Sequence, residues 1–427
     1  MKTFSTIIEE KIKQTIILLD YIIWFLFDFT KFKKINKQNI NKVLVIHLGA
    51  IGELIISTPC ITALKNSFGC EIKYMVAKGK EQVLENNPHL SEILIFNKDI
   101  NSNVKNLKEE SFDLAVILSP GNYKISNMCK RSKINYIVGC FVGVRTIPAL
   151  FFNKRVFPIS KKHAVEKNLD IVAQVGACND NPILEIYISK KENSKILKKI
   201  KDMNLNKYAV IHPGFGLIRE NIHPSRMWPI ERYGEVADYL VTKYGFDVIL
   251  TCTKEEEYIS KAIKNLTKNK ENVMIFNNLN IRDFMGIIKY SELVIEPSTG
   301  AGHIASALGV PVIDLIGRGE PHEWKPWAKS KKYIYLFHNE VCVSCNKNYC
   351  RLKDNVCMKS IQSNEVKFAI DKLLEANMDR DYRFYSNKFD KNWENKTNEN
   401  RKDNRKKEEI NKSLYVNKDS INENCSI

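Results

Sequence analysis

An apolar run followed by very small residues, at positions 291–309, constrains the fold of this chain more than any other feature. The run from Ser291 to Ile295 predicts a buried strand, and a helix begins within the loop that follows it. The small residues of that loop are Thr299, Gly300, Ala301 and Gly302. Their backbone N–H groups can approach an anion closely, and the positive N-terminal end of the helix adds to the attraction. The pattern therefore predicts a strand–loop–helix unit that binds phosphate.

A second glycine loop of the same kind lies near the start of the chain. The apolar run 43–48 predicts a buried parallel strand, and it leads directly into a short loop and a helix. The loop reads His47, Leu48, Gly49, Ala50, Ile51, Gly52 and Glu53. A single loop of this type is equally compatible with a tight turn that binds no ligand. The presence of two such loops favours a ligand-binding protein.

Short apolar runs alternate with helical periods in two successive halves of the chain. The predicted strands are 43–48, 71–77, 93–96, 113–118 and 135–138 in the first half, and 208–212, 247–251, 273–276, 293–295 and 311–316 in the second. This alternation predicts an α/β fold of two doubly wound parallel sheets, in domains 43–190 and 205–377, with a Lys- and Asn-rich linker at 190–206. Because such sheets bind ligands at the carboxyl ends of their strands, we expect the two domains to face an interdomain cleft.

Both ends of the chain differ from this body. Residues 1–42 contain an apolar run, 16–29, that Asp20 and Asp28 interrupt and that lysines flank. The interruptions argue against a spanning helix, so the segment predicts either a helix in the plane of a membrane or one packed on the protein's own body. Residues 378–427 are charged and poor in apolar side chains, which predicts disorder.

Composition narrows the class of partner and the compartment. The formal net charge of +17 indicates an anionic partner, such as a phosphorylated substrate or an acidic membrane surface. The basic residues are spread along the chain rather than interleaved with aromatic ones, which argues against nucleic acid. The 11 cysteines are an odd number, and no cleavable signal sequence precedes them. We therefore expect a cytoplasmic, reducing compartment.

Several motifs together carry a family resemblance. They are the loop 47–53, the helix start 163–169 with Gly176 at its end, the loops 212–214 and 225–229, and the small-residue loop 298–303. In this order and spacing, over about residues 42–375, the chain resembles glycosyltransferase family 9, the heptosyltransferases of lipopolysaccharide core assembly.

The resemblance implies the GT-B arrangement of two Rossmann-like domains and an inverting transfer of a sugar, heptose, from an ADP-sugar donor. It implies an acceptor that is a lipid-linked saccharide of the lipopolysaccharide core or a related cell-envelope structure, at the inner face of the cytoplasmic membrane. It assigns Glu53 as the general base and Gly49, Ala50 and Gly52 to the acceptor side. The donor-binding residues that it implies are His212, Gly214, Arg226, Glu256, Thr299, Gly300, Ala301, Gly302 and His303. No cofactor and no catalytic metal are expected, because backbone N–H groups and Arg226 neutralise the diphosphate.

The chain departs from the family pattern at a few positions. Glu53 stands where the family usually has Asp, Ser298 where it often has Asp, and His47 where it often has Arg. These departures keep two alternatives open, a nucleotide-sugar epimerase of the same architecture and a non-catalytic binding protein. For Glu53 itself, the alternative is a carboxylate that only stabilises the helix N-terminus.

One cysteine cluster stands apart from the other cysteines. It comprises Cys342, Cys345, Cys350 and Cys357. Four thiolates can form a closed tetrahedral zinc site, but the spacing lacks paired C-x-x-C motifs. Structural zinc, a disulfide and free thiols therefore all stay open for this cluster.

Overall fold

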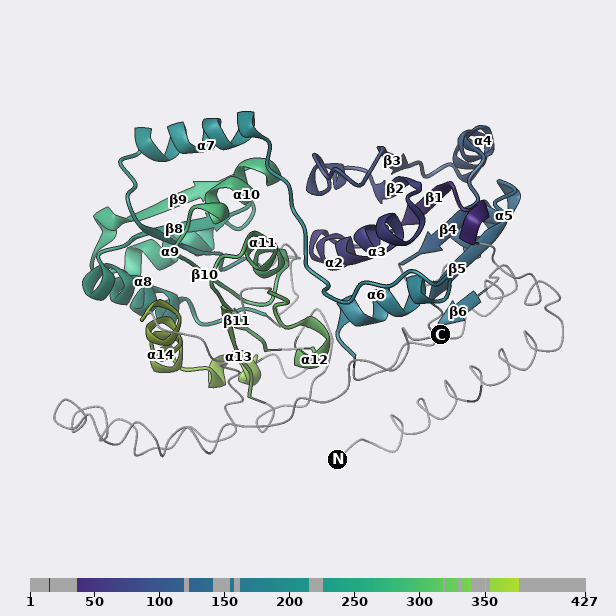
Figure 1. Ribbon diagram of the computed structural model, residues 1–427. Coiled ribbons are helices and arrows are strands. Elements are labelled where there is room, and N and C mark those ends of the chain that lie inside the picture. The colour runs from purple at the N-terminus through teal and green to yellow at the C-terminus, as the bar shows by residue number, and fades with distance from the viewer. Residues whose placement is uncertain are drawn as a thin grey trace. The chain divides into compact units, whose positions relative to one another are not determined.

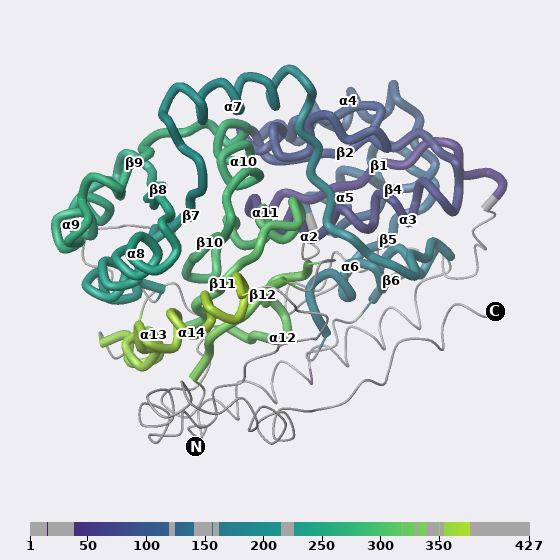
Figure 2. Tube along the Cα trace, turned by 60° about the vertical axis from the view of Figure 1, so that its left-hand side comes forward, coloured from purple at the N-terminus to yellow at the C-terminus, as the bar shows by residue number. Residues whose placement is uncertain are grey.

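The computed structural model describes residues 15, 37–118, 123–140, 154–156, 162–214, 226–317, 319–328, 332–338, 350 and 354–375. The chain divides into two compact units, Met1–Lys190 and Lys191–Ile427. Each unit has its own parallel sheet with helices on both faces (Figures 1 and 2). Residues 1–36 other than Thr15, and the whole predicted disordered tail, lie outside the described residues.

The first unit contains a six-stranded sheet in the order β3-β2-β1-β4-β5-β6. All of its strand pairs are parallel. The strands are β1 Lys42–Ile46, β2 Glu71–Ala77, β3 Glu92–Phe96, β4 Leu114–Ile117, β5 Tyr136–Cys140 and β6 Lys154–Val156. The helices are η2 Lys37–Asn39, α2 Ile51–Ile56, α3 Thr58–Phe68, η3 Glu81–Val83, α4 Ile100–Glu110, α5 Tyr123–Arg131 and α6 Ala164–Ala173.

The strands of this sheet are apolar along their length because helices cover both faces. On one face, α4 and α5 pack on β1 and β4 through a core that includes Leu44, Ile117 and Met128. The helices α3 and α6 contact each other. His163 caps α6 at its N-terminus, and the Glu166 side chain reaches back to the His163 backbone, as in a capping box.

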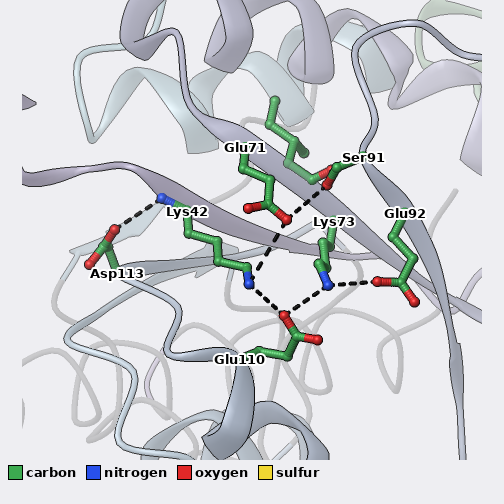
Figure 3. Close-up of polar contacts among 8 residues, drawn as sticks. Lys42, Glu71, Lys73, Ser91, Glu92, Glu110 and Asp113 are labelled. Atoms are coloured by element: carbon green, nitrogen blue, oxygen red, sulfur yellow. Dashed lines mark hydrogen bonds and ion pairs between the residues drawn. The ribbon is translucent and has the colours of Figure 1, made fainter.

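In the first unit, a network of ion pairs joins the strands β1, β2 and β3 near their amino ends to the end of α4 (Figure 3). Lys73 Nζ lies 2.6 Å from Glu92 Oε2 and 2.8 Å from Glu110 Oε2. Lys42 pairs with the same Glu110 oxygen, and its backbone N–H donates to Asp113 at 3.0 Å. The network fixes the end of α4 against β1, β2 and β3, at the edge opposite to the loop that follows β1.

The second unit repeats the design with the order β12-β11-β10-β7-β8-β9. Its strands are β7 Tyr208–Ile211, β8 Asp247–Cys252, β9 Val273–Asn277, β10 Leu293–Glu296, β11 Val312–Leu315 and β12 Tyr333–Leu336. Its helices are α7 Lys190–Asp202, α8 Ile230–Tyr244, α9 Glu257–Leu266, η5 Lys270–Asn272, α10 Ile281–Lys289, α11 Gly300–Leu308, α12 Pro321–Trp324, α13 Val356–Ser360 and α14 Ser363–Leu374. Read from β9 to β12, the strand order is the same as in the first unit, so the prediction of two doubly wound sheets is confirmed.

The core of the second unit lies between the sheet and the helices α8, α9 and α14. Trp228 is fully buried there, and its indole N–H donates to the Ile361 carbonyl oxygen at 2.9 Å. Its ring packs edge-on against Tyr233 of α8, with ring centroids 4.7 Å apart. The hydrogen bond from Trp228 to Ile361 connects the segment before α8 to the C-terminal part of the unit.

Most of the segment 190–206, which composition predicts to be a linker, is helical in the structure, because α7 occupies Lys190–Asp202. The helix is polar, but its one buried side chain, Ile196, packs against Gly286 of α10. An ion pair between Glu192 and Arg282, 2.7 Å long, adds to this contact. Tertiary contacts therefore order a sequence whose composition by itself predicts a linker.

The structure bears on the predicted membrane segment only in part. Within the described residues, no helix combines the length and the apolar character needed to cross a bilayer. The apolar run 16–29 lies outside those residues, so an in-plane helix there stays a prediction.

Candidate functional site

The three predicted glycine loops, 47–53, 212–214 and 298–303, follow the carboxyl ends of the central strands β1, β7 and β10. In the first unit the loop after β1 leads to α2, and β1 lies between β2 and β4. In the second unit the loops after β7 and β10 follow neighbouring strands. In both sheets these positions are where the strand order reverses, which is where doubly wound folds bind ligands.

Glu53 lies in the first turn of α2 and is half-buried. Its Oε2 accepts a hydrogen bond from the Ala50 backbone N–H at 2.5 Å. A carboxylate here satisfies an N–H group that the helix leaves without an intrahelical partner, and it is favoured by the helix dipole. The geometry therefore gives Glu53 a capping role, in a side chain that is not fully buried.

Gly49 is needed for this arrangement on steric grounds. A Cβ atom at that position would lie 2.2 Å from Glu53 Oε2 and 2.5 Å from His47 Cε1. His47 is buried, and its Nδ1 accepts from the Gly49 N–H at 3.1 Å. Burial, with a smaller contribution from the charge of Lys80, lowers the His47 pKa to about 4, so the ring is neutral and able to accept.

Lys80 is a neighbour of this loop that the sequence reasoning missed. Its Nζ donates to the Gly49 carbonyl oxygen at 2.6 Å, although the two residues are 31 positions apart. The available signal was its position just after β2, the strand next to β1, at the same edge of the sheet. Lys80 brings a positive charge to the predicted acceptor side.

The structure brings together three of the predicted donor residues after β7 and β8. A Cβ atom at Gly214 would lie 2.4 Å from Glu256 Oε2, so this backbone packs directly on a buried carboxylate. His212 Nδ1 lies 2.9 Å from Thr251 Oγ1. Burial lowers the His212 pKa, and the nearby Glu256 charge opposes that shift. The segment 215–225 that follows lies outside the described residues.

Thr299 organises the loop before α11. It is the N-cap of the helix, and its Oγ1 accepts from the Ala301 N–H at 3.2 Å. Both the backbone N–H and the hydroxyl of Thr299 donate to Glu296 Oε2, the hydroxyl at 2.6 Å. Two of the four N–H groups predicted to face an anion thus donate within the loop, which leaves those of Gly300 and Gly302 for a ligand.

Arg226 lies against this loop. Its Nη1 donates to the Ser298 carbonyl oxygen at 2.6 Å. His303, near the start of α11, is buried, and burial followed by the charge of Arg226 lowers its pKa to about 4. The structure therefore gathers Arg226, Thr299 and His303 around one helix N-terminus, with His303 uncharged; their role in donor binding stays a prediction.

Glu296 and Asp314 are the functional candidates in this unit that the sequence reasoning missed. They lie on β10 and β11, are paired in register, and are both buried. Burial is the largest cause that raises the Glu296 pKa, to about 7. Burial and the Glu296 charge raise the Asp314 pKa well above its usual value. The signal was an acidic residue within an otherwise apolar strand, in Leu293–Glu296 and again in Val312–Leu315.

The cysteine cluster is only partly described. Cys342 and Cys345 lie outside the described residues. Cys350 Sγ accepts from the Asn355 N–H at 3.3 Å, and Cys357 is buried beside Gly317. Across the described part of the chain, no group of three or more His, Cys, Asp or Glu side chains is placed to hold a metal ion. Structural zinc stays a prediction.

Known proteins resemble this chain in both sequence and fold. The family model for glycosyltransferase family 9 (heptosyltransferase) matches residues 100–355. Lipopolysaccharide heptosyltransferase 3 of Escherichia coli (strain K12) is 21% identical over 303 residues, which cover 65% of this chain and 83% of that protein.

Two solved structures support the fold. A glycosyl transferase family 9 protein from Veillonella parvula DSM 2008 superposes with a TM-score of 0.66 at 19% identity, covering 80% of this chain and 99% of that one. The E. coli ADP-heptose LPS heptosyltransferase II gives a TM-score of 0.64 at 18% identity, covering 78% and 98%. These likenesses confirm the predicted GT-B fold class of two Rossmann-like domains. Because the family model covers more than half of the chain, this protein belongs to glycosyltransferase family 9 (heptosyltransferase), and it is a glycosyltransferase.

Proposed function

We propose that this protein is an inverting transferase that moves a heptose from ADP-heptose to a lipopolysaccharide-core or related cell-envelope saccharide. The loop before α11 carries the proposal, because it combines a helix N-terminus with glycines that let a diphosphate approach the backbone. Two relatives whose names specify heptosyl transfer, one of them from ADP-heptose, support the choice of sugar and nucleotide.

The donor residues divide into two groups. The N–H groups of Gly300 and Gly302 and the N-terminal end of α11 meet the diphosphate, and the charge of Arg226 lies just behind them. The buried Glu256 and the backbone of Gly214 form the floor of the nucleoside side. A buried carboxylate suits the hydroxyl groups of a ribose, because it accepts hydrogen bonds from them.

The transfer itself needs a base and a leaving group. In the proposed reaction the acceptor hydroxyl gives its proton to Glu53 while its oxygen bonds to the anomeric carbon. The bond from that carbon to the diphosphate oxygen breaks, and ADP leaves with the negative charge that the α11 N-terminus stabilises. Attack opposite to the leaving group inverts the anomeric centre.

The decisive experiment is a donor panel. Purified protein is mixed with ADP-heptose, ADP-glucose, UDP-glucose and UDP-N-acetylglucosamine, each with membrane-extracted saccharide acceptors, and nucleotide release and products are measured. We expect acceptor-dependent ADP release from ADP-heptose only. Epimerised UDP-sugar without transfer would support the epimerase alternative, and tight ADP-heptose binding without turnover would support a binding protein.

We also propose a location at the inner face of the cytoplasmic membrane. The net charge of +17 and the lysine-flanked apolar run 16–29 support attachment to anionic lipid. Flotation with phosphatidylglycerol vesicles at low salt tests this with the full-length protein and a variant lacking residues 1–36. We expect only the full-length protein to float, and equal flotation of both would remove the segment from the proposal.

A further inference from the structure

Two carboxyl groups lie side by side beneath the loop that precedes α11. Glu296 ends β10, and the parallel register pairs it directly with Asp314 of β11. Their exposed fractions are 1% and 2%. Paired residues on adjacent strands project to the same face of a sheet, so the two buried carboxyl groups are neighbours.

Glu296 holds the loop from inside. Its Oε2 accepts both the backbone N–H and the hydroxyl of Thr299. Its other oxygen lies against Gly302, where a Cβ atom would come within 2.3 Å of Oε1. One carboxylate therefore contacts both the beginning and the end of the small-residue loop.

Arg226 contacts the same loop at Ser298, the residue before Thr299. It donates to the carbonyl oxygen of Ser298, whose φ of 55° lies in the left-handed region. A serine adopts that conformation only at some cost in energy, so the surrounding contacts must maintain it. The loop is thus fixed by Glu296 at Thr299 and by Arg226 at Ser298.

The negative charge of the buried pair Glu296 and Asp314 needs a positive charge nearby. Among the described residues, Arg226 faces both carboxyls and Tyr233 of α8 faces Glu296, while His303 of α11 lies near Arg226. Burial raises the Tyr233 pKa and lowers the His303 pKa, so both are uncharged near neutral pH. Arg226 therefore balances one carboxylate, and a second negative charge would be uncompensated beneath a diphosphate site.

We propose that Glu296 and Asp314 are positioning residues for the donor loop. Glu296 as a carboxylate ties Thr299 in place, while Asp314 keeps its proton and donates it in a hydrogen bond to Glu296, so that the pair carries one negative charge. The inference rests on the proposed function, since it takes the loop to bind the donor diphosphate.

Three variants test the two roles, with ADP as the ligand in calorimetry at pH 7.5 and amide hydrogen exchange of residues 298–302 in the ligand-free protein. Glu296→Gln keeps an acceptor oxygen for Thr299, so we expect ADP affinity within about threefold of wild type. Glu296→Met has a similar length without an acceptor, so we expect at least tenfold weaker binding and faster exchange in the loop.

Asp314→Asn tests the proton. Its amide still donates to Glu296 but cannot ionise, so affinity at pH 7.5 should stay within about threefold. From pH 7.5 to 9.5 the wild type should lose ADP affinity relative to this variant, because only the wild type can gain a second negative charge. Parallel pH profiles for the two proteins would overturn the shared proton.

Tyr244→Phe is the control for general loss of stability. It removes a 2.7 Å hydrogen bond to Asp371 between α8 and α14, outside the contacts of the loop. We expect a lower Tm with unchanged loop exchange and ADP affinity. Wild-type exchange and affinity in Glu296→Met would overturn the role of Glu296. If the wild type binds no ADP, the proposed donor is wrong, and loop exchange in Glu296→Met still decides whether Glu296 positions the loop.

Discussion

In the loop after β1 and in the loop after β10, a carboxylate accepts a hydrogen bond from a backbone N–H group at a helix N-terminus, but the carboxylate comes from opposite sides of the loop. Each strand ends where a helix N-terminus presents backbone N–H groups that need partners. In the first loop, Glu53 comes from the helix and reaches back to the Ala50 N–H. In the second, Glu296 comes from the strand and reaches forward to the Thr299 N–H. In both, a glycine packs directly on the carboxylate, Gly49 in one and Gly302 in the other.

The two carboxylates differ in their access to water. Glu53 is half-buried, whereas Glu296 is buried against Asp314. A proton acceptor in a reaction must reach its substrate, so the half-buried carboxylate suits the base better than the fully buried one, which suits a structural role. In our proposals, the same motif of strand, glycine and acid therefore serves chemistry in one domain and loop geometry in the other.

Glu53→Gln is the sharpest test of this contrast. The amide can retain the loop but cannot accept a proton, so we expect kcat to fall by about 100-fold or more with little change in ADP affinity. Steady-state ADP release measures the first quantity and calorimetry the second. Glu53→Asp should keep part of the activity, and wild-type turnover in Glu53→Gln would remove Glu53 from the mechanism.

Alanine substitutions at the two glycines should separate the two domains. Gly302→Ala displaces the Glu296 carboxylate that holds Thr299, so ADP affinity should fall at least tenfold. Gly49→Ala displaces the Glu53 carboxylate instead, so turnover should fall by a similar factor while ADP affinity is retained.

Gly234→Ala is the matched control for these glycine variants. It lies inside α8, where an added Cβ atom meets its nearest neighbour at an ordinary 3.4 Å. We expect unchanged kinetics and a stability gain of about 0.5–1 kcal/mol in thermal unfolding. Equal loss of ADP affinity in the Gly49 and Gly302 variants would contradict the division of roles.

Each of the two loops has its own buried histidine, His47 in the first unit and His303 in the second. Their effect on stability should be smaller than the effects predicted above, and it should depend on pH. The pKa values of His47 and His303 are lowered to about 4, below the usual 6.5, so the unfolded chain binds more protons between these pH values. The stabilising contribution is therefore complete above pH 6.5 and is lost as the pH falls toward 4, by at most about 1.4 kcal/mol per pH unit for each histidine. His47→Asn and His303→Asn should each reduce this slope in urea unfolding measured between pH 4 and 7.

Metal removal should have the smallest effect. Because the proposed donor site uses backbone N–H groups and Arg226, treatment with EDTA should leave the rate of ADP release unchanged within about twofold. Full loss of activity that magnesium restores would contradict this prediction.

The sequence predicted most of the fold because its strands are buried on both faces. Continuous apolar runs such as 43–48 and 208–212 lie where β1 and β7 occur, and α8 and α10 begin and end where their apolar periods do. The helices α4 and α5 have a weaker local pattern, because they are rich in polar residues. Their order depends on contacts with the sheet that no local pattern reveals.

Local sequence patterns located both loops, but they did not reveal the contacts that distant residues make with them. Glycine and small residues after a strand marked both loops, and the structure places Arg226, Thr299 and His303 around the second of them. Lys80 was missed because only strand pairing brings it to Gly49. Glu296 and Asp314 were missed because only the pairing of β10 with β11 brings the two acids together.

The sequence by itself determined that this protein has two doubly wound domains and where their ligand-binding loops begin, since periodicity and glycine placement act over a few neighbouring residues. Only the tertiary structure decided which carboxylate stays accessible and which is buried. That choice depends on the register of β10 with β11, which places Asp314 beside Glu296, while Glu53 remains at a half-buried helix end. Burial and the pairing of charges are properties of residues distant in sequence, so they arise only once the sheet has formed.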